Sequence, residues 1–285
     1  LAPAKLPPIL KRMKPGGYSS HGPKTRRVAL MAGCAHPVLR PDLNEATIRL
    51  LNRHGVEVVL AKGEGCCGAL PHHMGKSDDG DRLAKRNIDA WISEMDTNGL
   101  DAIVINASGC GTTVKDYGFM FRNDPAYRDK ARRVSELACD VTEYLANIPL
   151  QVSGTGTGIN VAYHSACSMQ HGQGITTLPK TLLSKTGFQV LDVPEGHLCC
   201  GSAGTYNMLQ PDLARQLRDR KVKRIESLTP DVIATGNLGC MTQIATGTRI
   251  PIVHTVELLD WVTGGPRPVA LKQLNLTAKP GPSDI

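Results

Sequence analysis

The sequence predicts an α/β fold made of two duplicated halves, each a βαβαβ-type unit with a parallel sheet, related by a pseudo-two-fold. The first observation is that Cys-Cys-Gly occurs twice, at 66–68 and 199–201, each time 32 positions after an earlier cysteine, Cys34 or Cys167. The second is that short apolar runs alternate with helical patterns around both sets. Strands that alternate with helices form parallel sheets, so the fold class follows from both observations together.

The cysteine spacing indicates an internal duplication. Shifting positions 34, 66 and 67 by 133 gives 167, 199 and 200, which are all cysteines. The same shift would move Cys110 to 243, whereas the cysteine is Cys240, so the second copy is three residues shorter in this interval. Nine cysteines among 285 residues would give only about 0.25 adjacent pairs by chance.

A predicted strand precedes every repeated cysteine position. Each strand is a short β-branched or apolar run that ends in a turn, and the cysteine follows. The segments that contain these strands are 25–34, 55–68 and 100–111 in the first copy and 159–167, 187–201 and 230–241 in the second. Because ligands bind outside the carboxyl ends of parallel strands, we expect the four cysteines of each copy to converge there.

Helical patterns occupy the intervals 41–55, 82–99 and 210–230. Pro211 suits a first helical position, and Gly55 and Thr229-Pro230 are C-terminal signals. The expected core residues keep a helical period: Leu43, Ile48, Leu50, Leu51, Trp91, Ile92, Met95, Leu213, Leu217, Val222, Ile225 and Leu228.

Three further segments complete the two copies. Residues 134–147 resemble 253–264, and we expect each to close its copy with a helix. The stretch 111–133 has the character of an insertion with four aromatic residues, and it is either a partner-docking surface or a segment that packs under a loop.

The domain prediction follows from these patterns. The first repeat spans 25–150 and the second 151–265, beginning with a Gly-rich linker, and 266–285 form a C-terminal tail. Residues 1–24 do not begin with Met and are rich in Pro, Gly and Lys, so we expect a linker or arm that follows a missing N-terminal region.

Composition excludes several classes of protein. The sequence has no apolar run of the length needed to cross a bilayer and no secretory signal, so we expect no transmembrane segment and a cytoplasmic location. The net charge of +7 is typical of a solvated surface, and without basic motifs interleaved with aromatic residues it does not indicate a nucleic-acid partner. Nine cysteines in a chain of this kind indicate metal or redox chemistry.

Four thiolates at each site suit an iron–sulfur cluster, a zinc ion or a pair of redox-active disulfides. We favour the cluster, because two adjacent cysteines are poor partners for one small ion but each can bind a different iron. The predicted metal and cofactor ligands are Cys34, Cys66, Cys67 and Cys110 in the first copy, and Cys167, Cys199, Cys200 and Cys240 in the second. Cys139 has no counterpart, and we expect a buried structural thiol.

Five histidines are weaker candidates. They follow or flank the cysteines, and each is either an ordinary surface or packed residue or a hydrogen-bond partner of a sulfur that tunes the site. They are His36, His72, His73, His164 and His171.

These residues resemble the cysteine-rich CCG domain of the heterodisulfide reductase B subunit, and most of all the glycolate oxidase (glycolate dehydrogenase) iron–sulfur subunits. The stretches that carry the resemblance are GEGCCGALPHHMG, INASGCGTTVKDYG, VAYHSACSMQHGQ, LCCGSAGTYNMLQP and NLGCMTQI, within residues 25–265. The resemblance implies an upstream ferredoxin-like segment, whose Cys-x2-Cys-x2-Cys-x3-Cys-Pro runs do not occur in this sequence.

The sequence departs from the full CCG motif, which ends in Cys-x2-Cys. Thr113 and Gln243 stand at the positions of the fifth cysteine. The resemblance implies that five cysteines hold a non-cubane cluster in the disulfide-reducing relatives, so four cysteines favour an ordinary 4Fe-4S cluster, one per repeat.

The resemblance implies an oxidoreductase subunit that transfers electrons within a glycolate dehydrogenase. FAD on a partner subunit would oxidise the 2-hydroxy acid, and this chain, with no catalytic residues for the substrate, would pass electrons toward a quinone at the cytoplasmic face of the inner membrane. The alternatives are a thiol–disulfide reductase of the heterodisulfide reductase type and a zinc-stapled scaffold subunit. Lactate and glycerol-3-phosphate are alternative substrates.

Overall fold

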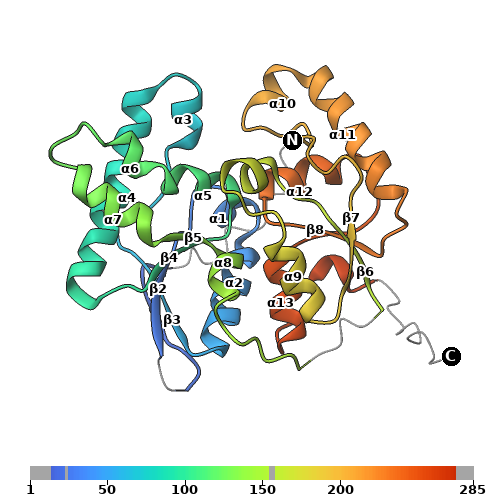
Figure 1. Ribbon diagram of the computed structural model, residues 1–285, viewed down its shortest axis with the longest axis horizontal. Helices are drawn as coiled ribbons and strands as arrows, with labels where there is room; N and C mark the ends of the chain where they lie inside the picture. Colours follow the sequence, from blue (N-terminus) through green and yellow to red (C-terminus); the bar gives the residue numbers. More distant parts are fainter. Residues whose placement is uncertain (1–13, 23–24, 154–157, 274–285) are drawn as a thin grey trace. The chain divides into compact units, whose positions relative to one another are not determined.

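The computed structural model describes residues 14–22, 25–153 and 158–273, and these divide into two compact units between Pro149 and Leu150 (Figure 1). Parts of the predicted N-terminal linker, of the Gly-rich linker and of the C-terminal tail lie outside the described residues. Within the described part of the chain, no helix combines the length and the apolar character that a membrane span requires.

The first unit has a five-stranded sheet in the order β1-β3-β2-β4-β5. Its strands are β1 (Gly16–Tyr18), β2 (Arg26–Leu30), β3 (Val56–Leu60), β4 (Ala102–Ile105) and β5 (Ala138–Asp140), all parallel except β1. Its helices are α1 (His36–Leu39), α2 (Pro41–Arg53), α3 (Ala69–His73), α4 (Ser77–Asn98), α5 (Ser108–Lys115), α6 (Tyr117–Met120), α7 (Arg128–Leu137) and α8 (Val141–Leu145).

The second unit has a four-stranded, fully parallel sheet in the order β7-β6-β8-β9. Its strands are β6 (Asn160–Tyr163), β7 (Gln189–Asp192), β8 (Val232–Thr235) and β9 (Ile252–His254). The helical elements are η1 (Ser168–Gly172, a π-helical turn), α9 (Leu178–Lys185), α10 (Tyr206–Leu209), α11 (Pro211–Glu226), α12 (Leu238–Ala245), α13 (Thr255–Val262) and η2 (Val269–Leu271).

The two sheets share one topology, since β3-β2-β4-β5 corresponds to β7-β6-β8-β9. The predicted α/β class and its duplicated halves are therefore confirmed. The pseudo-two-fold between the halves stays a prediction.

The predicted closing helices are present as α8 and α13, and a short strand that was not predicted precedes each of them. Residues 134–147 contain the end of α7, the strand β5 and the helix α8, and residues 253–264 begin in β9 before α13. The short strand forms because Ala138-Cys139-Asp140 pairs with the open edge of β4, and Asp140 then caps α8 by accepting a hydrogen bond from Thr142 N at 2.8 Å. Each sheet consequently gains a fourth parallel strand.

Part of the predicted N-terminal linker is also ordered. Residues 16–18 form β1, an antiparallel edge strand on β3 with Gly17 opposite Val59. A Gly-rich sequence gives no apolar alternation, so the pattern of the chain did not indicate this strand.

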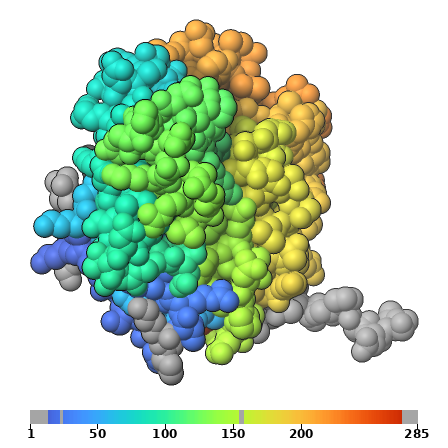
Figure 2. Space-filling view, turned by 60° about the vertical axis from the view of Figure 1, so that its left-hand side comes forward, coloured from blue at the N-terminus to red at the C-terminus, as the bar shows by residue number. Residues whose placement is uncertain are grey.

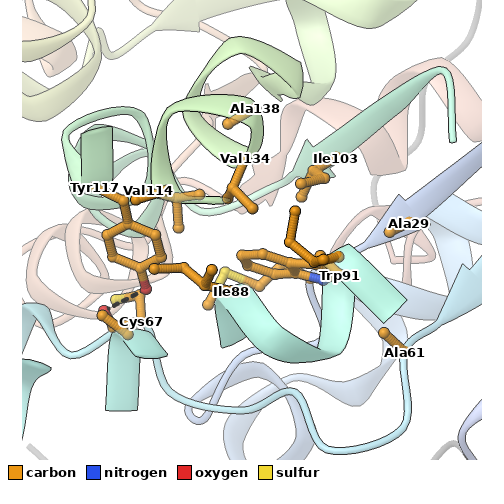
Figure 3. Packing of buried hydrophobic residues seen from close by; sticks show 14 of the residues in the cluster. Ala29, Ala61, Cys67, Ile88, Trp91, Ile103, Val114, Tyr117, Val134 and Ala138 are labelled. Carbon is orange, nitrogen blue, oxygen red and sulfur yellow. Dashed lines mark hydrogen bonds between the residues drawn. The ribbon is translucent and has the colours of Figure 1, made fainter. Parts of the chain in front are cut away.

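One core cluster of the first unit surrounds Trp91 of α4 (Figure 3). Trp91, Ile88 and Ile103 are fully buried there, and Val134 of α7 closes the cluster. Most residues that the helical period placed in the core are therefore buried or partly buried. Leu213 is the exception: it is 50% exposed, because the first turn of α11 turns only Ala214 inward.

The aromatic stretch 111–133 mainly packs onto α4, and Figure 2 shows it in green at the surface beside the cyan α3 and α4. Tyr117 and Phe121 are buried, and Lys85 Nζ lies 4.8 Å from the ring centroid of Tyr127. Of the two alternatives for this stretch, packing inside the unit therefore applies to Tyr117 and Phe121, whereas Phe119 is 61% exposed.

An aspartate directly before β4 in the first unit, and one directly before β8 in the second, fixes the strand register. Asp101 Oδ2 accepts a hydrogen bond from Arg27 N at 2.6 Å, and Asp231 Oδ2 accepts one from Asn160 N at 2.8 Å. In return, each aspartate donates its backbone N–H to the carbonyl of the same partner.

We expect Asp101→Ala to lower the free energy of unfolding by about 1 kcal/mol, because it leaves Arg27 N without its charged acceptor. Asp101→Asn keeps an acceptor and should lose less. Urea denaturation of the two variants measures the difference, and equal losses would contradict this role of the carboxylate.

Candidate metal centres

The four cysteines of each copy meet at the carboxyl ends of three adjacent parallel strands. In the first unit, Cys34 follows β2, Cys66 and Cys67 follow β3, and Cys110 lies in the first turn of α5 after β4. Their thiols are hydrogen-bond partners in the order Cys34–Cys66–Cys67–Cys110. The predicted convergence is therefore present in the structure.

The second unit repeats this arrangement. Cys167 follows β6, Cys199 and Cys200 follow β7, and Cys240 lies in the first turn of α12. The thiols again form a row in chain order, and all of these cysteines are free of disulfide bonds.

The two rows differ in depth. Cys34 is exposed, whereas its counterpart Cys167 is half-buried. Cys240 is buried, whereas Cys110 is only partly so. The second row is thus more enclosed than the first.

The electrostatics of each row favour a thiolate at its second cysteine. The thiol of Cys34, followed by that of Cys67, donates to the Cys66 sulfur and holds its pKa far below the usual range. The Cys199 pKa is lowered in the same way by Cys167 and Cys200. Gly201 N also donates to Cys199 Sγ at 3.3 Å, so backbone groups help to stabilise negative sulfur.

The fourth cysteine of each row lies at a helix start, where N–H groups and the helix dipole favour negative charge. Asn237 Oδ1 caps α12 by accepting from Cys240 N at 3.1 Å. The pKa of Cys240 falls to about 6, because the Cys200 thiol donates to it and His164 lies close, although burial acts in the opposite direction.

The glycine after each cysteine pair is required by the backbone and by the neighbouring helix. Gly68 has φ +85° and Gly201 has φ +87°, a left-handed conformation that disfavours other residues. A Cβ on Gly68 would lie 2.5 Å from Gly80 O of α4, and one on Gly201 would lie 2.2 Å from Ala214 O of α11. Each helix therefore packs directly on its turn.

Side chains that sequence reasoning missed hold the first turn in place. Asn87 Oδ1 accepts from Gly65 N at 2.8 Å, and Asn87 Nδ2 donates to Cys66 O at 2.9 Å. Tyr117 Oη donates to Cys67 O at 2.7 Å (Figure 3). The sequence offered only a polar residue, Asn87, beside the apolar positions of α4, and the structure shows that its amide is fully buried.

Glu64 links the first turn to the loop after β2. Its carboxylate accepts from Ala32 N at 2.9 Å and from Trp91 Nε1 at 3.2 Å. Burial raises the pKa of Glu64 to about 7. Beside it lies a cavity of about 380 Å³ whose lining includes Cys34 and Pro15.

Different residues support the second turn. Lys221 Nζ donates to Glu195 O at 2.8 Å, and Gln170 Nε2 donates to Gly196 O at 3.0 Å. Lys221 is 2% exposed, and burial lowers its pKa. Both turns are thus fixed through their backbone carbonyls, by unrelated side chains.

The residues at the two positions of the fifth cysteine hydrogen-bond to backbone carbonyls of helices. Thr113 is buried and its Oγ1 donates to Gly109 O at 3.3 Å within α5. Gln243 is buried and its Nε2 donates to Ala214 O at 3.3 Å, which ties α12 to α11.

The five histidines fall into two groups. His72, His73 and His171 are exposed, and His171 Nε2 contacts His197 O at 3.1 Å. His36 and His164 are buried, and burial lowers the pKa of His36 to about 4. A role of any of them beside a sulfur stays a prediction at this point.

Cys139 lies in β5, outside both rows. It is partly buried, and burial raises its pKa to about 12. A raised pKa disfavours the thiolate that binds metal, which agrees with a structural thiol.

The spacing of the sulfurs fits a cluster better than a single ion. A tetrahedral zinc ion needs its four sulfurs about 3.8 Å apart in every pair. Among the described residues, no three cysteine sulfurs lie within 4.8 Å of one another, and the one compact set of possible ligands is His164, Cys200 and Cys240. A cluster takes one thiolate per iron and accommodates a wider row.

Comparison with known proteins places this chain among cysteine-rich proteins. The family model CCG, described as "Cysteine-rich domain", matches residues 28–115 and 161–245. One solved structure, a hypothetical protein from Helicobacter pylori, superimposes with a TM-score of 0.57 at 9% identity over 90% of this chain and 52% of that one, which concerns the fold alone.

Curated relatives align with most of the chain. The chain is 44% identical over 257 residues to the "Glycolate oxidase iron-sulfur subunit" of Escherichia coli, covering 90% of this chain and 62% of the relative. It is 28% identical to the "Probable glycolate oxidase iron-sulfur subunit" of Bacillus subtilis, covering 90% and 60%. It is 27% identical to "Lactate utilization protein A" of Bacillus licheniformis, covering 82% and 99%. The chain therefore spans less than two thirds of the first two relatives.

We expect Gly68→Ala to lower the free energy of unfolding by about 2–4 kcal/mol, from left-handed strain and from overlap with Gly80 O. Gly75→Ala is the matched control, because Gly75 has φ +76° but nothing within 4 Å of an added Cβ. It should lose only about 1 kcal/mol. Urea denaturation measures the free energy of unfolding of both variants, and equal losses would show that α4 does not pack tightly against Gly68.

Proposed function

The chain belongs to the cysteine-rich CCG family, and from this premise we propose that it is an iron–sulfur electron-transfer subunit of a glycolate (2-hydroxy acid) dehydrogenase complex. The observation that carries the proposal is the same four-thiol row at the strand ends of both units. The names of the glycolate oxidase relatives support the complex.

Each row would hold one 4Fe-4S cluster, which supplies one-electron transfer when bound. The ligands would be Cys34, Cys66, Cys67 and Cys110 in the first unit, and Cys167, Cys199, Cys200 and Cys240 in the second. The absence of a fifth cysteine supports four-ligand clusters, because Thr113 hydrogen-bonds within α5 and Gln243 hydrogen-bonds to a carbonyl of α11.

The protein's contribution would be to hold the thiolates and to compensate their charge. Adjacent cysteines would bind different irons. The left-handed glycine after each pair lets the chain turn sharply there. Backbone N–H groups and the starts of α5 and α12 offset negative charge on the sulfurs.

Substrate oxidation would take place on a partner chain that carries FAD. This chain would receive the electrons and pass them toward a quinone, as a cytoplasmic protein peripheral to the inner membrane. Lactate and glycerol-3-phosphate remain alternative substrates, and the lactate utilization relatives support the first of these. We keep 25–150 and 151–265 as the proposed limits of the two repeats.

One observation favours zinc at the second site. His164, Cys200 and Cys240 are compact enough to contact a single ion. A zinc-stapled scaffold is therefore the second candidate function, and metal analysis separates it from the first.

We expect anaerobically purified protein to contain about eight iron atoms and about eight acid-labile sulfides per chain, with little zinc. Reduction should give electron paramagnetic resonance signals from two clusters. Zinc without sulfide would contradict the electron-transfer function, and metal-free protein whose thiols oxidise reversibly in pairs would support a disulfide reductase instead.

Cys67→Ser should remove one cluster signal and about half of the iron, because Cys67 is a predicted ligand of the first row only. Cys139→Ser is the control and should keep both signals, since Cys139 lies outside both rows. If Cys67→Ser retained both signals, the ligand assignment would be wrong.

A further inference from the structure

At two equivalent positions near the cysteines, one copy has a histidine where the other has a methionine. The offset of 133 positions aligns Met31 with His164 and His36 with Met169. All four side chains are buried, with exposed fractions of 4% or less. Since the copies otherwise place their cysteines alike, this exchange is a chemical difference between the two sites.

In the first copy the histidine belongs to a network of amides. Asn44 and Asn106 are side-chain hydrogen-bond partners of His36. Asn106 Nδ2 donates to Asn44 Oδ1 at 2.9 Å, and Asn44 Nδ2 donates to Ala32 O at 3.0 Å. The imidazole is therefore held by amides, while Met31 packs into the apolar cluster that contains Cys67.

In the second copy this network is replaced by an apolar contact. Gly236 stands in the place of Asn106, and a Cβ at Gly236 would lie 2.8 Å from Met169 Cε. Tyr163 Oη donates to Met169 Sδ at 3.4 Å. The methionine thus occupies the space of the amide network, and the histidine of this copy lies at a different position.

That histidine, His164, directly follows β6 and faces the cysteines. Its backbone N–H donates to Ala234 O at 2.8 Å, which extends the pairing of β6 with β8. One ring nitrogen and the sulfurs of Cys200 and Cys240 all lie within 4.8 Å of one another. Both ring nitrogens are buried, and the side-chain hydrogen-bond partner beside the ring is Cys240. A buried imidazole without a partner is costly, so a sulfur beside it is the natural acceptor.

We propose that His164 donates an N–H hydrogen bond to the Cys240 sulfur and thereby raises the reduction potential of the second copy's cluster above the value it would otherwise have. This inference rests on the proposed function. Reduction adds negative charge to the cluster and its sulfurs, and an N–H dipole directed at a sulfur stabilises the reduced state more than the oxidised one. Met31 offers no N–H, so the first site lacks this contribution.

His164 acts through Cys240 and is a positioning residue. Burial of the second row disfavours added charge and lowers the reduction potential, whereas the hydrogen bond raises it. A comparison of the potentials of the two sites would therefore combine both effects. Substitutions at position 164 within one site separate them.

The test measures the midpoint potential of the second cluster by redox titration followed by electron paramagnetic resonance, in a Cys67→Ser background that removes the first signal. His164→Met, which copies the first site, should shift the potential downward. His164→Gln keeps an N–H donor and should restore much of the parent value. His171→Gln is the matched control, because His171 is exposed, and it should leave the potential unchanged.

A second measurement needs no variant. In protein labelled with ¹⁵N-histidine, pulsed electron paramagnetic resonance should detect a weak nitrogen coupling to the second cluster. No coupling would overturn the proposal, and so would the strong coupling of a directly bonded nitrogen. An unchanged potential in His164→Met, with iron and sulfide retained, would also overturn it.

The failure of this inference is distinguishable from failure of the proposed function. If the parent protein lacked iron and sulfide, the proposed electron-transfer function itself would be wrong. If both clusters were intact and their reduction potentials did not change on substitution of His164, only the role of His164 would be wrong.

Discussion

The left-handed glycine after each cysteine pair is the constraint on which the rest of each unit depends. Gly68 and Gly201 reverse the chain after β3 and β7, and a backbone carbonyl of the next long helix lies where their Cβ would be. Any other residue would push the helix away and displace the pair from the strand ends. The glycine therefore couples the packing of α4 and α11 to the position of the thiols.

Parallel strand order brings the remaining thiols to this turn. β2 lies between β3 and β4, and β6 lies between β7 and β8, so the carboxyl ends of three neighbouring strands are followed, in spatial order, by two, one and one cysteines. Residues distant in the sequence thus form one row without a dedicated metal-binding loop. Polar side chains then fix the turns through backbone carbonyls, and they leave the sulfurs available as ligands.

The sequence predicted those features that depend on local pattern and on repetition. Strands before the cysteines, the main helices and the convergence of Cys34, Cys66, Cys67 and Cys110 all follow from apolar runs and spacing. It did not predict β5 and β9, because three-residue strands are specified by the open sheet edge. It also missed Asn87 and Lys221, since an amide or amine in a helix shows its role only when burial and a carbonyl partner are known.

The duplicated sites are alike in their thiols and different in their surroundings, as expected of two copies that diverged from one unit. The central claim is that each row of four cysteines holds a four-iron cluster. Native mass spectrometry of the intact chain, purified without oxygen, tests it most directly. Two filled sites predict the mass of the polypeptide plus two clusters of four irons and four sulfides; the mass of the bare chain, or of the chain with one or two zinc ions, would contradict this claim.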